Sequence, residues 1–325
     1  MFAQLINTLK KSPKTIVFTE GTDPRILEAS ARLLSGNFLK PVLVGNPDEI
    51  AAAAEDIGFN IRGAEIIDPE NFDGMDEMVD EMVALRKGKM TADECRAALK
   101  KSNYFGTMLV KMGKADCLLG GATYSTADTV RPALQLIKTK PGNKIVSSCF
   151  IMVRPAASGE NEVLAMADCA INIKPNEDEL VEICKETVSC AKIFGVDPKV
   201  AFLSYSTLGS GKGEDVDKMR NACEKAKALM PDTPIGGEFQ FDAAVSPAVA
   251  KTKHITDAVG GHANTFIFPD INAGNIGYKI AQRLGGFEAY GPILLGLNAP
   301  INDLSRGCNA QEVYSMAIIT AALAE

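Results

Sequence analysis

The sequence predicts an α/β protein built from two α/β domains with a cleft between them. Short apolar runs rich in β-branched residues alternate with longer segments of helical periodicity along the chain. The length of 325 residues is that of about two ordinary domains. The sequence contains no internal repeat and no low-complexity tract. Strand–helix alternation at this spacing is typical of parallel sheets with helices on both faces.

The first half of the chain shows this alternation clearly. Helices are expected to start at Pro24 and Pro47, because each proline follows an Asp or Asn that can cap a helix. Two further helices are expected at 75–87 and 91–101, and another contains Arg131. The expected strands are residues 15–20, 41–45, 64–68 and 117–121.

The pattern changes near residue 145, where we place a domain boundary. Two long apolar runs at 144–152 and 162–172 are interpreted as adjacent strands, with antiparallel pairing as one arrangement. The run 293–297 is expected to bring the chain back to the first half. The other expected elements are helices at 178–194, 216–230 and 273–284 and strands at 200–206 and 264–268.

The composition excludes several classes of protein. A net charge of -7 and a pI near 5.1 argue against a general nucleic-acid binder, which needs a basic face. No apolar run reaches about 18 residues, and no signal peptide is evident, so we expect a cytoplasmic protein with no membrane partner. The eight cysteines form no CxxC motif and are expected to be free thiols.

The strongest candidates for catalytic side chains lie close together in the last stretch of the chain. A loop with Ser305 and Arg306 is expected to follow the apolar run 293–297 and to lead into a C-terminal helix. Asn309 and Glu312 have the spacing of a capping box at the start of that helix. A hydroxyl, a guanidinium and a carboxylate thus lie at a strand end and a helix N-terminus, where open α/β folds bind anions.

Each of these residues also has a simpler interpretation. Ser305 could cap the following turn, and Arg306 could be a solvated surface cation. Glu312 could do no more than cap its own helix. The functional alternative is that Ser305 and Arg306 face developing negative charge, and that Glu312 takes a proton from a thiol.

Two more arginines are candidates for phosphate contact. Arg131 follows a glycine-ended strand and the polar turn that contains Ser125 and Thr126. Arginines at helix starts are also often exposed without a role. Arg86 lies at a helix end, where it could simply oppose the helix dipole.

Other motifs are not supported. The turn at 207–213, TLGSGKG, lacks both the Walker pattern and GxGxxG, so a tight turn is the preferred interpretation. The two histidines, His254 and His262, have no second ligand at metal spacing, and the carboxylates are scattered. We therefore expect no metal site.

Several stretches together resemble the phosphate acetyltransferase (phosphotransacetylase) family. They are STADTVRPALQLIKT at 125–139, VAFLSYSTLGSGKG at 200–213, FPDINAGNIGYKIAQRLGG at 268–286 and NDLSRGC at 302–308. The resemblance implies reversible acetyl transfer: acetyl-CoA and phosphate give acetyl phosphate and coenzyme A (CoA). It implies a homodimer with no tightly bound cofactor, with CoA as a substrate and with stimulation by monovalent cations.

The resemblance also implies a fold and a set of site residues. The fold has two domains similar to those of isocitrate and isopropylmalate dehydrogenases, with the active site in the cleft. The first domain would comprise residues 1–145 and 297–325, completed by the C-terminal helix, and the second residues 146–296. Ser305 and Arg306 match the family's essential serine and arginine, and Glu312 stands where the family usually has aspartate. The implied substrate-binding residues are Arg131, Arg86, Ser125, Thr126 and Asn302.

Three rival functions remain open at this point. A phosphate butyryltransferase would keep the scaffold and widen the acyl pocket. An NAD-dependent decarboxylating dehydrogenase would need a cluster of metal-binding aspartates, which is not found. A non-catalytic CoA-sensing domain would resemble the modules appended to malic enzymes. Against it, we expect this chain to stand alone, and it retains Ser305, Arg306 and Arg131.

Overall fold

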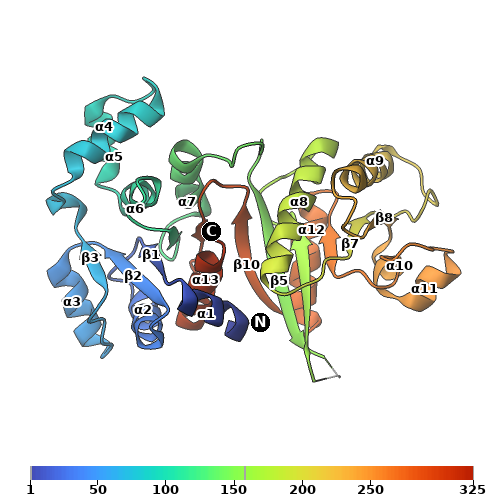
Figure 1. Ribbon diagram of the computed structural model, residues 1–325, viewed down its shortest axis with the longest axis horizontal. Helices are drawn as coiled ribbons and strands as arrows, with labels where there is room; N and C mark the ends of the chain where they lie inside the picture. Colours follow the sequence, from blue (N-terminus) through green and yellow to red (C-terminus); the bar gives the residue numbers. More distant parts are fainter. Residues whose placement is uncertain (1, 157–158, 325) are drawn as a thin grey trace. The chain divides into compact units, whose positions relative to one another are not determined.

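The computed structural model describes residues 2–156 and 159–324 of the chain. They form two compact units, drawn in Figure 1. Unit 1 comprises the residues up to Gly142 and those from Leu297 onward, and unit 2 comprises Asn143–Gly296. Each unit is an α/β structure around its own sheet.

Unit 1 contains a five-stranded parallel sheet of order β11-β4-β1-β2-β3. Helices lie on both sides of this sheet, with α2 and α3 on one side and α6 on the other (Figure 1). The strands are β1 (Lys14–Phe18), β2 (Leu39–Val44), β3 (Glu65–Ile67), β4 (Cys117–Gly120) and β11 (Ile301–Asp303). The helices are α1 (Phe2–Lys11), α2 (Pro24–Gly36), α3 (Pro47–Asp56), η1 (Pro69–Asn71), α4 (Met75–Arg86), α5 (Ala92–Leu99), α6 (Ser102–Lys111), α7 (Thr126–Pro132), η2 (Ala133–Ile137) and α13 (Ala310–Ala322).

Local sequence signals explain where these helices begin. The Asp23 side chain accepts a hydrogen bond from the Arg25 backbone N–H, one residue beyond Pro24. Thr91 and Glu94 form a capping box at the start of α5, which confirms a helix in the predicted range 91–101. The predicted helices that start at Pro24 and Pro47 are confirmed as α2 and α3.

The strand order of unit 1 creates a switch point between β1 and β4. From β1 the chain adds β2 and β3 on one side, and it later adds β4 on the other side of β1. Phe18 pairs with Leu119, and Asp303 pairs with Gly120, so β1, β4 and β11 end at the same edge. Open α/β sheets bind ligands outside the carboxyl ends of their strands at such a point.

Unit 2 contains a six-stranded mixed sheet of order β10-β5-β6-β9-β7-β8. Its fully buried phenylalanines Phe202, Phe239 and Phe266 lie on three of the parallel strands. The strands are β5 (Ser147–Pro155), β6 (Asn161–Ala167), β7 (Val200–Leu203), β8 (Ile235–Phe239), β9 (Thr265–Ile267) and β10 (Glu288–Leu295). The helices are α8 (Glu177–Ile193), α9 (Glu214–Leu229), α10 (Phe241–Val245), α11 (Pro247–Thr252) and α12 (Ile271–Leu284).

The antiparallel arrangement of the apolar runs 144–152 and 162–172 is confirmed, because β5 and β6 pair antiparallel. Strand β10 also pairs antiparallel with β5, so the sheet of unit 2 is mixed, whereas strand–helix alternation alone predicts a parallel sheet. Most of the apolar run 293–297 belongs to β10 at the edge of the second sheet, and the chain returns to unit 1 only at the last residue of the run, Leu297. The strand that precedes the Ser305 loop is instead β11, a three-residue strand in unit 1.

The cysteines are all free and buried. This confirms the prediction that they act as small apolar residues rather than as disulfides. Burial raises the pKa of several of them, among them Cys117, Cys184 and Cys223. Their thiols are therefore poor nucleophiles.

Candidate active site

The loop between β11 and α13 presents a hydroxyl and a free guanidinium. Ser305 and Arg306 are both exposed. The Ser305 hydroxyl accepts a hydrogen bond from the Gly307 N–H at 3.2 Å, and the Ser305 carbonyl accepts one from the Cys308 N–H at 2.9 Å. Within the part of the chain that the structure describes, the Arg306 guanidinium has no hydrogen-bond or ion-pair partner. The loop is thus fixed through its backbone while the cation of Arg306 stays available.

The first turn of α13 carries the predicted capping box. The Asn309 side chain accepts from the Glu312 N–H at 2.9 Å, and Glu312 Oε2 accepts from the Asn309 N–H at 2.9 Å. Glu312 itself is exposed, and its Oε1 has no partner among residues 2–156 and 159–324. Capping is therefore one role of this residue, and proton transfer through the second oxygen stays a prediction.

Asp303, at the end of β11, ties the loop to α7. Its two carboxylate oxygens accept hydrogen bonds from the hydroxyls of Thr126 at 2.6 Å and Thr129 at 2.5 Å. Burial raises the pKa of Asp303 from 3.8 to about 6, even though both threonines oppose the rise. The nearby Glu20 carboxylate adds to the rise. One carboxyl group thus joins the end of β11 to α7.

Glu20, just beyond the end of β1, lies at the switch point itself. Its Oε1 accepts from the backbone N–H groups of Gly121 at 3.1 Å and Thr123 at 3.0 Å, both in the loop after β4. Its Oε2 accepts a hydrogen bond from the Thr19 hydroxyl at 2.8 Å. The same hydroxyl is hydrogen-bonded to Tyr124 Oη at 2.7 Å. Burial raises the pKa of Glu20 despite these donors.

Sequence reasoning missed this buried pair of carboxyl groups as part of the site. Glu20 is the last residue of the expected strand 15–20, whereas Asp303 falls in the expected loop after the run 293–297 and carries no such local signal. Their proximity depends on β4 lying between β1 and β11. No short sequence motif specifies that strand order.

Ser125 and Arg131 are joined through a single acid on α7. The Ser125 hydroxyl donates to Asp128 Oδ2 at 2.7 Å, and Arg131 Nη1 lies 3.9 Å from Asp128 Oδ1. All three residues are well exposed or half-buried at the surface of unit 1. The hydrogen bond from Thr126 to Asp303 joins α7 to the end of β11, just before the Ser305 loop.

Arg86 is the last residue of α4, as predicted, and is partly buried. Its Nε is buried and has no hydrogen-bond partner within the described residues. Helix α4 packs against η2, which follows α7 directly. Among the residues that the structure describes, Arg86 forms no hydrogen bond or ion pair with Ser305 or Arg306, so its place in the site stays a prediction.

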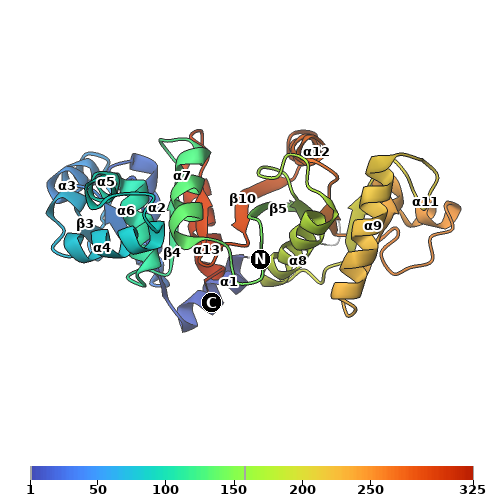
Figure 2. The same cartoon turned by 90° about the horizontal axis from the view of Figure 1, so that it is seen from above.

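Asn302 has a different environment from the other predicted site residues. It is fully buried, and its Nδ2 donates to Thr320 Oγ1 on α13 at 2.9 Å. This bond holds α13 against β11, and α13 also packs beside α2 and β4 (Figure 2). The burial argues against direct contact between Asn302 and a substrate.

Comparison with known proteins identifies the family. The model of the phosphate acetyl/butaryl transferase family matches residues 1–321. The chain belongs to this family. It is 53% identical over 309 residues to a phosphate acetyltransferase of Bacillus subtilis strain 168, covering 95% of this chain and 94% of that protein. Membership makes the chain an acyltransferase enzyme.

Solved structures agree with the family and with the fold. A phosphotransacetylase from Streptococcus pyogenes superposes with a TM-score of 0.96 at 51% identity, covering 99% of this chain and 97% of that one. A 4-hydroxythreonine-4-phosphate dehydrogenase from Salmonella typhimurium superposes at 0.56 with 12% identity, covering 96% and 100% of the two chains. The second likeness concerns the fold alone, and it confirms the expected dehydrogenase-like α/β domains.

The TLGSGKG turn of unit 2 is held by internal hydrogen bonds. The Gly209 N–H donates to the buried carboxylate of Glu238 at 2.7 Å, and the Gly211 N–H donates to Ser206 Oγ at 2.9 Å. A phosphate-binding loop points such N–H groups at its ligand. The observed bonds fit the predicted tight turn of this acyltransferase better than a phosphate loop.

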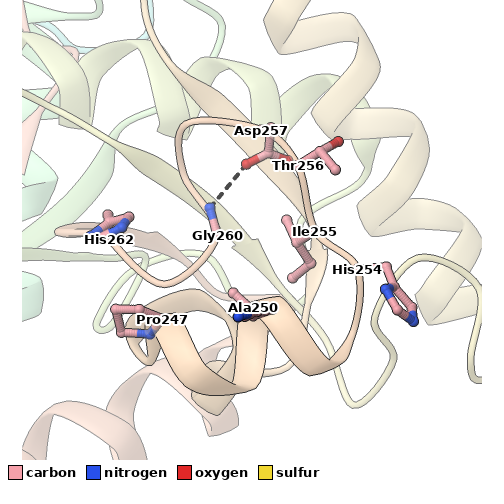
Figure 3. A pocket seen from close by; sticks show the side chains of 9 residues that line it. Pro247, Ala250, His254, Ile255, Thr256, Asp257, Gly260 and His262 are labelled. Carbon is pink, nitrogen blue, oxygen red and sulfur yellow. Dashed lines mark hydrogen bonds between the residues drawn. The ribbon is translucent and has the colours of Figure 1, made fainter.

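The two histidines line one pocket of unit 2, with a volume of about 420 Å³. Figure 3 shows His254 and His262 at opposite sides of this pocket, with Asp257 accepting a hydrogen bond from the Gly260 N–H at 2.9 Å. Among the residues that the structure describes, no group of three His, Cys, Asp or Glu side chains could hold a metal ion.

In the same residues, no helix is both long and apolar enough to cross a membrane.

Proposed function

We propose that the chain catalyses reversible acetyl transfer between CoA and phosphate by direct attack in a ternary complex. The similarity to phosphate acetyltransferases over nearly the full chain supports the acetyl-transfer reaction. The observation that carries the mechanism is the free, exposed guanidinium of Arg306 on a loop fixed by backbone hydrogen bonds. A preorganised cation of this kind stabilises charge that develops in a transition state.

In the direction of acetyl-CoA synthesis, the reaction begins with the thiol of CoA. Glu312 takes the thiol proton through the carboxylate oxygen that does not cap the helix. The thiolate attacks the carbonyl carbon of acetyl phosphate, and Arg306 with Ser305 stabilises the tetrahedral oxyanion. The C–O bond to phosphate then breaks, and phosphate leaves with the bonding electron pair. Binding both substrates together supplies the rest of the acceleration through orientation.

Arg131 and Arg86 have the role of holding the phosphate group. Arg131 is supported by its exposure and by its place on α7 beside the end of β11. Arg86 is supported by its buried Nε, which has no partner in the described residues. A guanidinium that binds phosphate with paired hydrogen bonds stabilises the leaving dianion.

The mechanism assigns no acyl-enzyme to Ser305. Unit 1 contains no histidine, because both histidines of the chain lie in unit 2. The Ser305 hydroxyl instead accepts a hydrogen bond from Gly307. The test is exchange of labelled phosphate into acetyl phosphate with CoA absent. We expect no exchange, and clear exchange would contradict direct attack.

Simple assays distinguish two alternative functions from the proposed one. The family includes butyryl transfer, and a phosphate butyryltransferase would turn over butyryl-CoA faster than acetyl-CoA. We expect the reverse, on the basis of 53% identity to a phosphate acetyltransferase. A non-catalytic CoA-sensing domain would bind CoA but release no acetyl phosphate. A protein that does not bind CoA at all would exclude both the enzyme and the CoA sensor.

A homodimer is part of the proposal. Ile276, Ile280 and Leu284 repeat every four residues on α12 and are 57%, 54% and 85% exposed. Ile173 is 68% exposed and contacts the start of this helix, since its carbonyl accepts the Ile271 N–H at 3.1 Å. The exposed side chains of Ile276, Ile280 and Leu284 form an uncharged stripe on α12. Such a stripe can pack against the same stripe of a second copy of the chain, which we propose as its partner.

The remaining parts of the proposal concern conditions and location. Eight free, buried thiols support a reducing compartment, which we take to be the cytoplasm. CoA, acetyl-CoA, phosphate and acetyl phosphate are the proposed small-molecule partners. Stimulation by monovalent cations is tested by comparing rates in potassium chloride and choline chloride at equal ionic strength.

A further inference from the structure

One guanidinium joins the three loops at the switch-point edge of unit 1. Arg25 lies in the first turn of α2, just after the loop that follows β1. Its Nε and Nη2 donate to the two carboxylate oxygens of Asp23 at 2.9 and 2.7 Å. Nη2 also donates to the carbonyl of Ala122, in the loop after β4, at 2.8 Å. Arg25 therefore ties the β1 loop to the β4 loop.

The same side chain also holds the loop that follows β11. Its Nη1 donates to the backbone carbonyl of Arg306 at 2.8 Å and to that of Cys308 at 3.1 Å. These two carbonyls lie on either side of Gly307, where the chain turns toward α13. Arg25 is thus in direct contact with the backbone from which the Arg306 side chain projects.

The hydrogen bonds account for every donor that Arg25 has. A guanidinium carries five N–H groups, and five oxygen acceptors surround this one. Hydrogen bonding to Asp23 raises the pKa of Arg25 further above its ordinary value, so the side chain is always charged. With no N–H left for a substrate, Arg25 can influence the reaction only through the groups that it holds.

We propose that Arg25 is a positioning residue, which sets the backbone of Arg306 and thereby aims its guanidinium at the reacting acyl group. This inference rests on the proposed role of Arg306. Lysine could not replace Arg25, because its three donors cannot reach five acceptors in three loops. A shift of about 1 Å in a catalytic group costs on the order of 10²-fold in rate.

The test is a double-mutant cycle with Arg25→Lys and Arg306→Ala, measured as acetyl phosphate formation from acetyl-CoA and phosphate. We expect Arg25→Lys alone to lower kcat by about 10²-fold, with KM for acetyl-CoA changed less than about threefold. In the Arg306→Ala background the same change should lower kcat by less than about threefold, because the group that it positions is gone.

Arg32→Lys is the matched control. Arg32 also joins α2 to α13, since its Nη2 donates to Gln311 Oε1 at 2.6 Å and its guanidinium lies over the Tyr314 ring. Within the described residues it forms no hydrogen bond or ion pair with residues 305–308. We expect this variant to keep the activity of the unmodified enzyme. Equal losses in Arg32→Lys and Arg25→Lys would show a general loss of helix packing and would overturn the proposal.

The remaining outcomes separate this inference from the mechanism. If Arg306→Ala keeps its activity, the role proposed for Arg306 fails. If Arg306→Ala is impaired but Arg25→Lys is not, only the role proposed for Arg25 fails. That role also fails if the losses in kcat from the two substitutions are additive in the double variant. If Arg25→Lys does not fold, Asp23→Asn replaces it in the cycle, because it keeps a capping side chain while weakening the hold on Arg25.

Discussion

The carboxylate of Asp303 accepts a hydrogen bond from the hydroxyl of Thr129 at 2.5 Å, across 174 positions of the chain. Both residues are buried, one at the end of β11 and the other on α7. A second hydroxyl, from Thr126, reaches the other oxygen at 2.6 Å. This carboxyl group is therefore the link between the loop that carries Arg306 and the helix that carries Arg131.

Asp303 predicts a specific dependence of stability on pH. Because the pKa of this group is raised from 3.8 to about 6 in the folded state, folding favours its protonated form. Its contribution to stability is fully present below pH 3.8 and is lost as the pH rises through about 6. A rise of about two pKa units corresponds to about 3 kcal/mol of unfolding free energy.

The measurement is urea unfolding of the unmodified protein and Asp303→Asn between pH 4 and pH 7. Groups that do not interact with Asp303 titrate equally in both proteins, so the difference between the two pH profiles reports Asp303 together with its neighbour Glu20. We expect the unmodified protein to lose about 3 kcal/mol more than the variant as the pH rises. Parallel pH profiles would show that Asp303 does not titrate in this range.

Local patterns in the sequence were enough to predict much of the fold. The capping signals at Pro24, Pro47 and Asn309 marked helix starts, because proline and a capping side chain act within one turn. Strand β8, with the sequence IGGEF, was not predicted, because two glycines hide its apolar pattern. The sequence predicts a loop where the short strand β11 lies, since three residues give no periodicity.

The candidate site was predictable only where a short stretch of chain carries it. Ser305, Arg306 and Glu312 lie within eight residues, and the structure finds them on one loop and helix start. The bonds from Arg25 to Arg306 and from Thr129 to Asp303 join distant segments. They follow from β4 lying between β1 and β11, which no local pattern specifies.

Glu312→Gln separates proton transfer from helix capping. Glutamine can still accept the Asn309 N–H, so the capping box and the thermal stability should be retained. Glutamine cannot take a proton from the CoA thiol, and we expect kcat to fall by at least about 10²-fold. The measurement is steady-state turnover together with the melting temperature. Full activity with unchanged melting would leave capping as the only role of Glu312.

Removing Arg131 should weaken the binding of phosphate. Each charge-assisted hydrogen bond is worth about 1.5–3 kcal/mol, so Arg131→Gln should lower kcat/KM for phosphate by about 10- to 10²-fold. Arg86→Gln is expected to have an effect of the same size. The control is Arg220→Gln, which removes an exposed arginine of α9 paired with Asp217. An unchanged kcat/KM for phosphate in both test variants would remove these arginines from the phosphate site.

The stripe on α12 predicts how the dimer can be broken. Ile280→Glu together with Leu284→Glu places two like charges in the proposed interface, where they would face their counterparts in the second copy. We expect light scattering to give the mass of one chain, against two for the unmodified protein. Leu229→Glu, at a similarly exposed leucine of α9, should leave the mass unchanged. A doubly substituted protein that stays dimeric would place the interface elsewhere.

The central claim is that the Arg306 guanidinium stabilises the oxyanion formed when the CoA thiolate attacks acetyl phosphate. The most direct measurement is kcat for acetyl transfer by Arg306→Ala, with the melting temperature as the check on folding. The account predicts a fall of about 10²- to 10³-fold in kcat with the melting temperature unchanged. A folded Arg306→Ala variant that turns over within about threefold of the unmodified enzyme would contradict it.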